Sequence, residues 1–526
     1  MDYETWAMNV SVDKDELRKF LVKIMAFANK TGIAFMTGSI YGGLAGFWDY
    51  GPIGIEIKNR IKEAWWMDFV RNRDDVVGYE GAIITHPKIW EASGHVSSFN
   101  DPLIFCTGNC KKRHRLDHLL EDQLEIRTEN LTLEEMGNLV TENALKCPDC
   151  GGDLGDPIKF NLMFKTQIGP VQDSSSVAYL RPENAQLIFS GFRNVIDSTR
   201  VKMPFGIAQS GPAFRNEISP RNFLFRVREF ELMEFEYFTD PDKINDCPKF
   251  DSIAETPVHI YSRSEQSQNF ENHYRIMTVG EAWEKEIFLN KWQAYWMTIF
   301  FIWFSQNLGI RKENLRFRQH LKTELSHYAL DTWDIEYKYP FGWKELMGCA
   351  NRTQYDLEQH QTHSNAKLHF TETTEKGVKR YVPYVVAEPS VGLGRILLTI
   401  LADSYTEEIV KGRKRVVLKI HPRVAPYDVA VFPLMKKDGI EEEATEIFRY
   451  LRSHGFVVSY DDSGSIGKRY RRHDEIGTPF CVTVDYETLE DTSTTVRMRD
   501  SMEQTRITRS ELVNQIRAFQ KTFQIT

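Results

Sequence analysis

Arginine, glutamate and phenylalanine residues gather in one stretch of the chain, Phe214 to Phe238. Pro220 and Asn222 indicate a turn inside it, so we expect two antiparallel strands joined by a loop. Because side chains alternate between the two faces of a strand, Arg215 and Glu217 share one face of the first strand. One face of the returning strand combines charged groups with a flat ring: Arg226, Arg228, Phe230 and Glu234.

Such a face suits a nucleotide. Guanidinium groups bind phosphate oxygens, a phenyl ring stacks on adenine, and a carboxylate accepts a hydrogen bond from an exocyclic amine. The opposite face of the returning strand is apolar: Val227, Met233, Phe235 and Tyr237. The alternative is a salt-bridged strand face in solvent, which is the usual role of an isolated charged hairpin.

Further polar groups stand beside apolar elements. Glu183 precedes a helical run, where surface capping is the ordinary role, although a carboxylate facing the core there could receive an ammonium group. Glu388 and Ser390 share a strand face, and Arg395 falls in the first turn of the apolar helix that follows. The segment 342–360 adds four polar features: Glu345, Arg352, Asp356 and His360.

Four cysteines form two close pairs, Cys106 with Cys110 and Cys147 with Cys150. Two thiol pairs across a charged spacer are typical of a zinc ribbon or knuckle, although the first pair has one residue more than the usual spacing. His114 and His118 are near enough to replace a cysteine. The alternative is a set of reduced thiols without metal, but the pairing and the glycines after Cys150 favour zinc.

The composition describes a folded protein of about two to four domains. The chain has 526 residues, 41% of them hydrophobic and 27% charged. The longest strongly apolar segment, 296–304, is too short to span a membrane, and the acidic N-terminus shows no leader peptide. Seven cysteines fit a reducing compartment, so we expect a cytoplasmic protein without a membrane partner.

A net charge of -8 excludes general nucleic-acid binding, so any RNA must be held by local basic patches. Basic residues concentrate at 412–423 and again at 467–473. The second run supplies the candidate RNA contacts Lys468, Arg469, Arg471 and Arg472. Basic runs are more often solvated surface than RNA sites.

Several elements must position these groups. Apolar periodicity predicts helices at 11–32 and 55–70 and a buried aromatic helix at 281–308, while 241–280 is polar and turn-rich. Residues 381–405 are predicted as a strand, a glycine-containing turn and a helix. Beyond residue 412, strands and helices alternate, which predicts a small α/β domain.

Four motifs, RPENAQ, FRNE with RVREF, GWKE, and EPSVGLGR, follow one another along the chain. In this order they resemble the homodimeric class II glycyl-tRNA synthetases of bacterial type, and the likeness covers nearly the whole sequence. The resemblance implies an α+β fold: a class II catalytic core with a six- or seven-stranded antiparallel sheet, and a C-terminal α/β anticodon-binding domain.

The same resemblance suggests domain bounds. The catalytic core would comprise 1–95 and 160–405, with motif 1 at about 55–87, motif 2 at about 212–238 and motif 3 at about 381–405. Residues 96–159 would form a cysteine-containing insertion, 241–310 a second, partly helical insertion, and 412–526 the anticodon-binding domain. In this family motif 1 builds the dimer interface.

Roles for single residues are also implied. Arg215 would hold the α-phosphate and the amino-acid carboxylate, and Glu217 the adenine amine. Arg395 would lie on adenine or at the γ-phosphate, and these three residues are the expected catalytic set. The implied ATP-binding set is Arg215, Asn216, Glu217, Phe225, Arg226, Phe230, Glu345, Leu346, Gly394 and Arg395, with Glu345 a magnesium contact. The implied glycine-binding set is Glu183, Glu234, Glu388 and Ser390.

The implied reaction joins glycine to tRNA(Gly) through glycyl-adenylate, with ATP and Mg²⁺, in a homodimer. Three glutamates around one ammonium group would leave no room for a methyl group, so larger amino acids are rejected by size. Two other readings stay open. One is a paralogue that makes an aminoacyl-adenylate for another acceptor, and the other is a non-catalytic, dimeric nucleic-acid-binding relative.

Overall fold

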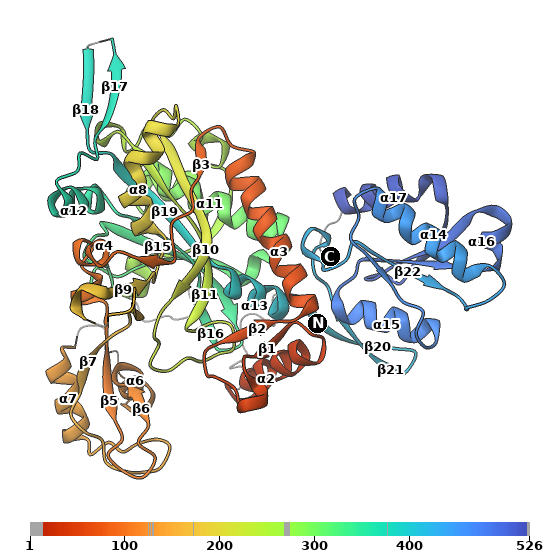
Figure 1. Cartoon of the computed structure of the whole chain (residues 1–526), viewed down its shortest axis with the longest axis horizontal. Helices are drawn as coiled ribbons and strands as arrows, with labels where there is room; N and C mark the ends of the chain where they lie inside the picture. Colours follow the sequence, from red (N-terminus) through yellow and green to blue (C-terminus); the bar gives the residue numbers. More distant parts are fainter. Residues whose placement is uncertain are drawn as a thin grey trace.

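The computed structural model describes residues 14–124, 126, 128, 131–171, 173–267, 274–375 and 377–522. The N-terminal residues on which the leader-peptide prediction rests lie outside this range. A large body built on one sheet carries a smaller C-terminal domain at its side (Figure 1). Among the helices in the described ranges, none is long and apolar enough to cross a membrane.

A nine-stranded sheet forms the centre of the large body. Its strands run in the order β13 (Arg275–Thr278), β12 (Pro257–Tyr261), β14 (Leu315–Gln319), β15 (Asp331–Tyr339), β16 (Gly342–Asn351), β19 (Tyr384–Gly392), β11 (Glu229–Thr239), β10 (Phe205–Phe214) and β3 (Val76–Gly78). The six strands from β14 to β10 are antiparallel. Parallel pairs, β12 with β14 and β10 with β3, extend the sheet on both sides.

Apolar helices cover this sheet. Helix α11 (Lys291–Ile302) is buried through Trp292, Trp296 and Phe300, because its sequence is apolar on nearly all sides. Helices α3 (Pro52–Trp66) and α13 (Leu393–Ser404) pack into the same core. Helices α8 (Ala185–Ser198) and α12 (Tyr355–Ser364) contact each other in a second cluster beside β10 and β19.

The hairpin of β10 and β11 is longer and more irregular in its turn than an ideal hairpin. Phe205 pairs with Phe238 at one end and Phe214 with Glu229 at the other. Asn222 and Phe223 adopt positive φ values of 60° and 58° in the connecting loop. Arg226 and Arg228 therefore lie in the loop rather than in the strand, and the alternation predicted for the returning strand begins only at Glu229.

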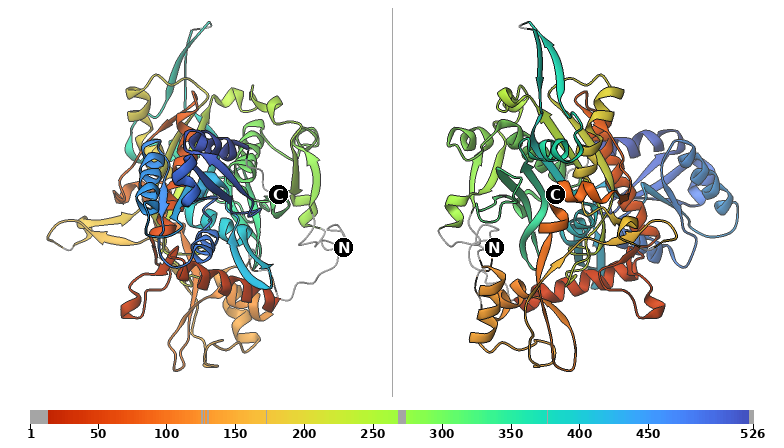
Figure 2. Two further views of the ribbon diagram at one scale, coloured as in Figure 1. Left: turned by 90° about the vertical axis from the view of Figure 1, so that its right-hand side faces the viewer. Right: turned by 60° about the vertical axis from the view of Figure 1, so that its left-hand side comes forward.

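Residues 241–310, predicted as a second, partly helical insertion, are built into the main sheet and its core. The segment supplies β12 and β13 to one edge of the main sheet and the buried helix α11 to its core. Its turn-rich sequence concealed the strands, since each has only four or five residues. A true protrusion stands elsewhere: the hairpin of β17 (Phe370–Thr374) and β18 (Gly377–Tyr381) extends away from the body in both views of Figure 2.

The cysteine-containing segment folds as a small separate unit below the main sheet (Figure 1). It combines β5 (Asn100–Phe105), β6 (Arg113–Arg115) and β7 (Ile158–Asn161) with the helices α6 (Leu116–Leu124) and α7 (Leu133–Glu142). Its own apolar cluster includes Ile104, Leu120 and Met136.

The C-terminal domain has a five-stranded sheet in the order β23 (Val458–Tyr460), β22 (Val429–Pro433), β24 (Phe480–Val484), β25 (Ser493–Met498) and β26 (Gln504–Thr508). Helices α14 (Ile440–Ser453), α15 (Ile466–Ile476), α16 (Tyr486–Asp491) and α17 (Arg509–Thr522) accompany it, as the alternating pattern predicted. The hairpin of β20 (Tyr405–Val410) and β21 (Arg413–Leu418) connects it to α13.

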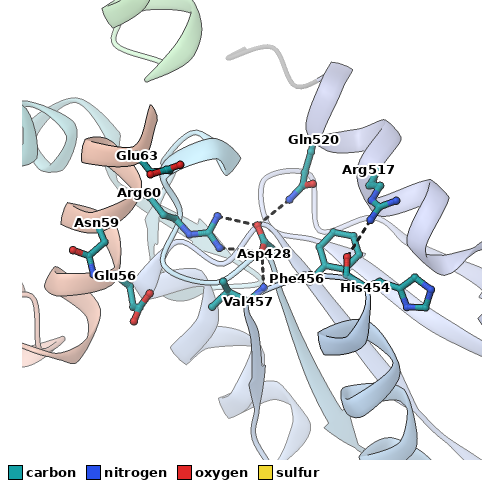
Figure 3. A pocket seen from close by; sticks show the side chains of 11 residues that line it. Glu56, Asn59, Arg60, Glu63, Asp428, His454, Phe456, Val457, Arg517 and Gln520 are labelled. Carbon is teal, nitrogen blue, oxygen red and sulfur yellow. Dashed lines mark hydrogen bonds and ion pairs between the residues drawn. The ribbon is translucent and has the colours of Figure 1, made fainter. Parts of the chain in front are cut away.

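A cavity of about 510 Å³ separates this domain from α3, and an ion pair crosses it (Figure 3). Arg60 of α3 donates two hydrogen bonds, of 3.0 and 2.9 Å, to Asp428. Asp428 also accepts from the Val457 amide and from Gln520. The same helix reaches the main sheet, where Lys58 and Lys62 pair with Glu231 of β11. Helix α3 thus connects the two domains.

Candidate active site

The first part of the site is the mouth of the β10–β11 hairpin. The Arg215 guanidinium lies 5.4 Å from the centre of the Phe230 ring and donates to the Pro182 carbonyl. Glu217 keeps one carboxylate oxygen, Oε2, buried and without a partner among the described residues. Asn216 is tied through its backbone to Leu162. An arginine and a ring therefore lie together, and a buried, unused acceptor follows two residues after the arginine, which are the groups predicted for adenosine phosphate.

Arg395 forms a second cluster at the start of α13. Its guanidinium lies 4.5 Å from the centre of the Phe225 ring and forms a 2.9 Å ion pair with Glu345. Gly394 packs closely beneath it, since a side chain there would meet the Leu224 carbonyl at 3.3 Å. The Leu346 side chain is fully buried, so only its backbone can face a ligand.

Two carboxylates, Asp334 and Glu345, lie on either side of Gly348. A side chain at Gly348 would meet Asp334 Oδ1 at 3.7 Å and Glu345 Oε1 at 3.8 Å. Burial raises the pKa of Asp334 to about 6, although His320 opposes this through a 2.8 Å contact. Oxygen donors around an open space are what Mg²⁺ prefers. Asp334 was not among the predicted residues.

The predicted glycine-binding residues cluster where β11 and β19 lie side by side, and this cluster is called the glycine pocket below. Glu234 pairs directly with Ser390 in the sheet, and the Ser390 hydroxyl donates to it at 2.5 Å. The Asn184 amide donates to the other oxygen of Glu234 at 2.6 Å. Burial nevertheless raises the pKa of Glu234.

Glu183 closes the pocket from the turn before α8. His95 Nε2 lies 3.3 Å from one of its oxygens and Arg352 3.8 Å from the other. Burial tends to raise the pKa of Glu183, but His95, Arg352 and Arg215 together outweigh burial and lower it. Glu183 is therefore ionised at neutral pH and available to an ammonium group.

Arg352 organises the remaining acids. It is 1% exposed and donates to both oxygens of Glu388 at 2.9 Å and to Asp356 at 2.8 and 2.9 Å. Its guanidinium also stacks on the Tyr328 ring at 3.8 Å. Asp356 in turn accepts from Gln186 at 2.7 Å. Even so, burial raises the pKa of Glu388 to about 8 against the charge of Arg352.

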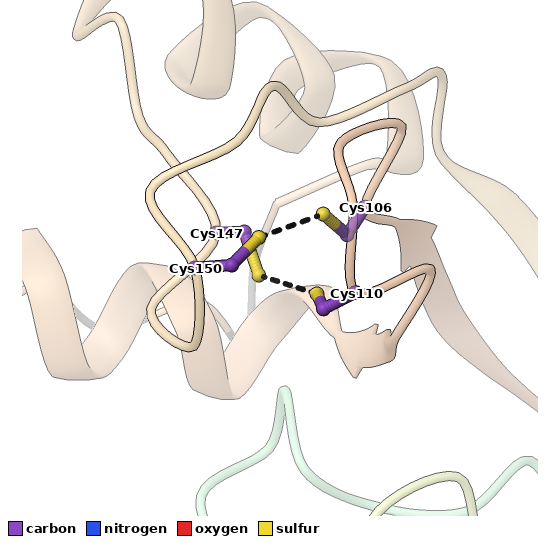
Figure 4. A group of neighbouring side chains, drawn as sticks. All are labelled: Cys106, Cys110, Cys147 and Cys150. Atoms are coloured by element: carbon purple, nitrogen blue, oxygen red, sulfur yellow. Dashed lines mark hydrogen bonds between the residues drawn. The ribbon is translucent and has the colours of Figure 1, made fainter.

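The cysteine unit brings its four sulfur atoms together (Figure 4). Their Sγ atoms all lie within 4.8 Å of one another, with Cys106 and Cys150 3.5 Å apart and Cys110 and Cys147 3.6 Å apart. All seven cysteines of the chain have free thiols in the described structure. Tetrahedral zinc with bonds of about 2.3 Å requires sulfurs about 3.8 Å apart, so this donor set fits the metal. The additional residue between Cys106 and Cys110 does not keep their sulfur atoms from reaching the other two.

The same unit touches the nucleotide end of the site. His118 Nε2 lies 3.5 Å from Arg226 Nη1. Burial and the neighbouring arginines hold the pKa of His118 at about 3, although Asp117 opposes them. His118 therefore faces Arg226 as a neutral imidazole. His114 instead lies 3.3 Å from the Cys147 sulfur, so only this histidine is near the thiol cluster.

The predicted RNA-binding residues lie on α15, but they differ in access. Arg469 is buried and donates to the carbonyls of Pro433, Asp462 and Gly464, so it holds the domain together. We therefore no longer include Arg469 among the residues proposed to bind RNA. Arg472 is exposed yet paired with Asp461. Lys468 and Arg471 are exposed.

Sequence reasoning missed four groups in the glycine pocket: His95, Asp356 as a partner of Arg352, Gln186, and Glu236. Gln186 belongs to the motif RPENAQ, whose resemblance to a family could have suggested it, whereas His95 lies outside the four motifs. Glu236 lies two residues after Glu234 and therefore on the same strand face, so alternation alone predicts it.

The antiparallel sheet, the arginine-bearing hairpin and the separate α/β domain define a class II aminoacyl-tRNA synthetase. Residues 164–404 match the family described as "tRNA synthetase class II core domain (G, H, P, S and T)", and residues 428–519 match "Anticodon binding domain". A prolyl-tRNA synthetase from Cryptosporidium parvum, solved with L-proline and AMP, shares the fold. Its TM-score is 0.57 at 14% identity, covering 99% of this chain and 79% of that one.

Sequence relatives are more specific. The chain is 45% identical to a glycine–tRNA ligase of Treponema denticola, over 95% of this chain and 97% of that protein. It is 46% identical to the one from Caldanaerobacter subterraneus subsp. tengcongensis, over 92% and 95%. The chain belongs to the glycine–tRNA ligase family.

Proposed function

We infer that this chain attaches glycine to tRNA(Gly) in an ATP-dependent reaction that proceeds through glycyl-adenylate and releases AMP and pyrophosphate. Its family membership supports the overall reaction. The observation that carries the assignment of the site is the meeting of Glu183, Glu234 and Glu388 in one buried pocket next to Arg215.

The first step is attack of the glycine carboxylate on the α-phosphorus of ATP. Both reactants are anionic, so the site must neutralise and align them, and an ionised carboxylate needs no general base. Arg215 acts on the charge of Glu183 and lies 5.4 Å from the centre of the Phe230 ring, which suits an arginine that holds both reacting groups. Arg226 and Arg395 are assigned to the outer phosphates.

The adenine ring is assigned to Phe230, with its amine on the unpartnered Oε2 of Glu217. This carboxylate oxygen is buried, so an amine donor would satisfy it at a gain of about 1–3 kcal/mol. Class II synthetases use Mg²⁺, which neutralises phosphate charge. Glu345 and Asp334 are the residues of this chain that would hold it.

Glycine is assigned to the glutamate pocket with its ammonium group toward Glu183, Glu234 and Glu388. Glu234 is held by the Ser390 hydroxyl and the Asn184 amide, and Glu388 by Arg352. These restraints fix the carboxylates around a small volume. A larger amino acid must displace a buried, hydrogen-bonded carboxylate, which accounts for selection of glycine by size.

We assign a structural zinc ion to Cys106, Cys110, Cys147 and Cys150, on the strength of the sulfur distances. Lys468, Arg471 and Arg472 are assigned to tRNA. Exposed apolar side chains in the loop between β1 (Ala34–Met36) and β2 (Trp48–Tyr50), Ile40, Tyr41 and Leu44, support a homodimer. The free thiols support a cytoplasmic location.

Replacing Glu388 by Gln tests the assignment of the pocket. The amide has the same size but cannot become a carboxylate when the ammonium group binds, so we expect aminoacylation of tRNA(Gly) to lose at least about tenfold in kcat/KM for glycine. The KM for ATP should change little. Unchanged glycine kinetics would show that glycine binds elsewhere. Glu358→Gln, on the exposed face of α12, is the matched control.

A further inference from the structure

Glu236 is a buried acid that no hydrogen bond joins to the described residues. Its side chain is 0% exposed, and neither carboxyl oxygen has a hydrogen-bond partner within the part of the chain that the structure describes. Leaving a buried polar group unpaired costs about 1–3 kcal/mol, and more for a charged group. An apolar residue would avoid that cost. We therefore expect Glu236 to have a role when a ligand is bound.

The position of Glu236 connects it to the glycine pocket. Strands β11 and β19 pair Glu234 with Ser390 and Tyr237 with Ala387, and the same register places Glu236 opposite Glu388. Residues directly opposite in an antiparallel pair have Cβ atoms about 4.5–5.5 Å apart. Glu236 and Glu234 also share a strand face. Glu236 is thus the cross-strand neighbour of a predicted ammonium ligand.

The guanidinium group of Arg352, beside this pair, already has other hydrogen-bond partners. Arg352 donates to Glu388 and to Asp356, and no hydrogen bond or ion pair joins it to Glu236 in the described structure. Burial and the charge of Glu388 raise the pKa of Glu236 well above its usual range, and burial raises the pKa of Glu388 to about 8, so the pair holds a proton near pH 7. The titratable and charged groups that face the pair are Glu183, Glu234, Tyr328, Cys349, Arg352 and Asp356.

We propose that binding of glycine is coupled to release of a proton from the Glu236–Glu388 pair. The inference rests on the assignment of glycine to this pocket. An O–H bond of the carboxyl pair breaks, its electrons remain on the carboxylate oxygen, and the proton passes to solvent. The glycine ammonium keeps its three N–H bonds and replaces the lost positive charge. The charge of the pocket is then the same before and after binding.

Isothermal titration of glycine into the enzyme, at one pH near 7 in buffers of different ionisation enthalpy, counts the protons released. We expect about one proton per glycine for the wild-type enzyme. Glycine affinity should accordingly rise up to about tenfold per pH unit between pH 6 and 8, while ATP affinity should not follow. The wild-type result alone can overturn the proposal, because binding heat that is independent of the buffer means no proton release.

Glu236→Gln locates the proton. The amide is neutral at every pH, so this variant should bind glycine with little buffer dependence and a flatter pH profile, whereas Glu358→Gln should match the wild type. Release of the same number of protons by Glu236→Gln would overturn the role of the pair. If the wild-type enzyme shows neither glycine heat nor glycine-dependent activity, the proposed function fails instead, so the two failures are distinguishable.

The pH dependence of the melting temperature provides a separate check that the Glu236→Gln variant folds. A raised pKa means that folded Glu236 keeps a proton which the unfolded chain loses above its usual pKa of 4.5, so the folded state loses stability as pH rises past that value. Glu236→Gln removes this loss. Its melting temperature should equal that of the wild type near pH 4 and exceed it at pH 8, and a lower value at pH 8 would contradict the account.

Discussion

Replacing Arg352 by Met is the substitution that we expect to destabilise the site most. The Arg352 side chain is 1% exposed and donates hydrogen bonds to two buried carboxylates, Glu388 and Asp356. Removing one partner of a buried ion pair costs about 3–5 kcal/mol, because the remaining charge is left uncompensated. We therefore expect the catalytic core to melt at least about 5 °C lower.

The same substitution should weaken glycine more than ATP. Without Arg352, the pKa of Glu388 rises further, so forming the carboxylate that pairs with the glycine ammonium group costs more free energy. A hydrogen bond to a charged group is worth about 1.5–3 kcal/mol, which corresponds to an increase of about 10- to 150-fold in the KM for glycine. ATP–pyrophosphate exchange measures both KM values in one assay.

Arg193→Ala provides the control. Arg193 forms an exposed ion pair with Asp197, four residues along α8, and such a pair contributes only about 0.2–0.5 kcal/mol. This variant should leave melting and kinetics unchanged. The reasoning is refuted if Arg352→Met melts together with the wild type, or if it raises the KM for ATP as much as that for glycine.

Three further predictions follow from the structure. Purified protein should contain one zinc per chain, and a strong chelator should make residues 96–159 sensitive to protease; metal-free protein with the same resistance would contradict this. Ser390→Ala removes the donor to Glu234 and frees the volume of one oxygen, so kcat/KM for glycine should fall by about 5- to 150-fold and alanine activation should become detectable. Reversing the charges of Lys468 and Arg471 should raise the KM for tRNA and flatten its dependence on salt, with glycine activation unchanged; an unaltered salt slope would exclude this contact.

Much of the site could be predicted from sequence because its chemistry is local. The alternation along β11 placed Phe230 and Glu234 on one face, and two pairs of cysteines foretold a cluster of four sulfurs. The same reasoning extended the strand too far, to Arg226 and Arg228, because left-handed residues at Asn222 and Phe223 are not evident from residue type. Asparagine and phenylalanine have no requirement for positive φ.

Tertiary contacts set the limit of prediction. Arg352 and Glu388 are 36 residues apart in sequence. They become partners only because β16 and β19 lie side by side. Arg469 stood in a basic run that suggested RNA, but the fold turns it inward to three carbonyls. The short strand β12 joined the main sheet through a parallel partner, and no turn signal can indicate such a pairing.

The most direct test of the account is ATP–pyrophosphate exchange by the purified enzyme without tRNA, with glycine compared against alanine and serine. The assignment of glycine to Glu183, Glu234 and Glu388 predicts exchange with glycine alone, because a larger side chain would have to displace a buried, hydrogen-bonded carboxylate. Exchange with alanine or serine at a rate comparable to that with glycine would contradict the assignment of these residues to glycine.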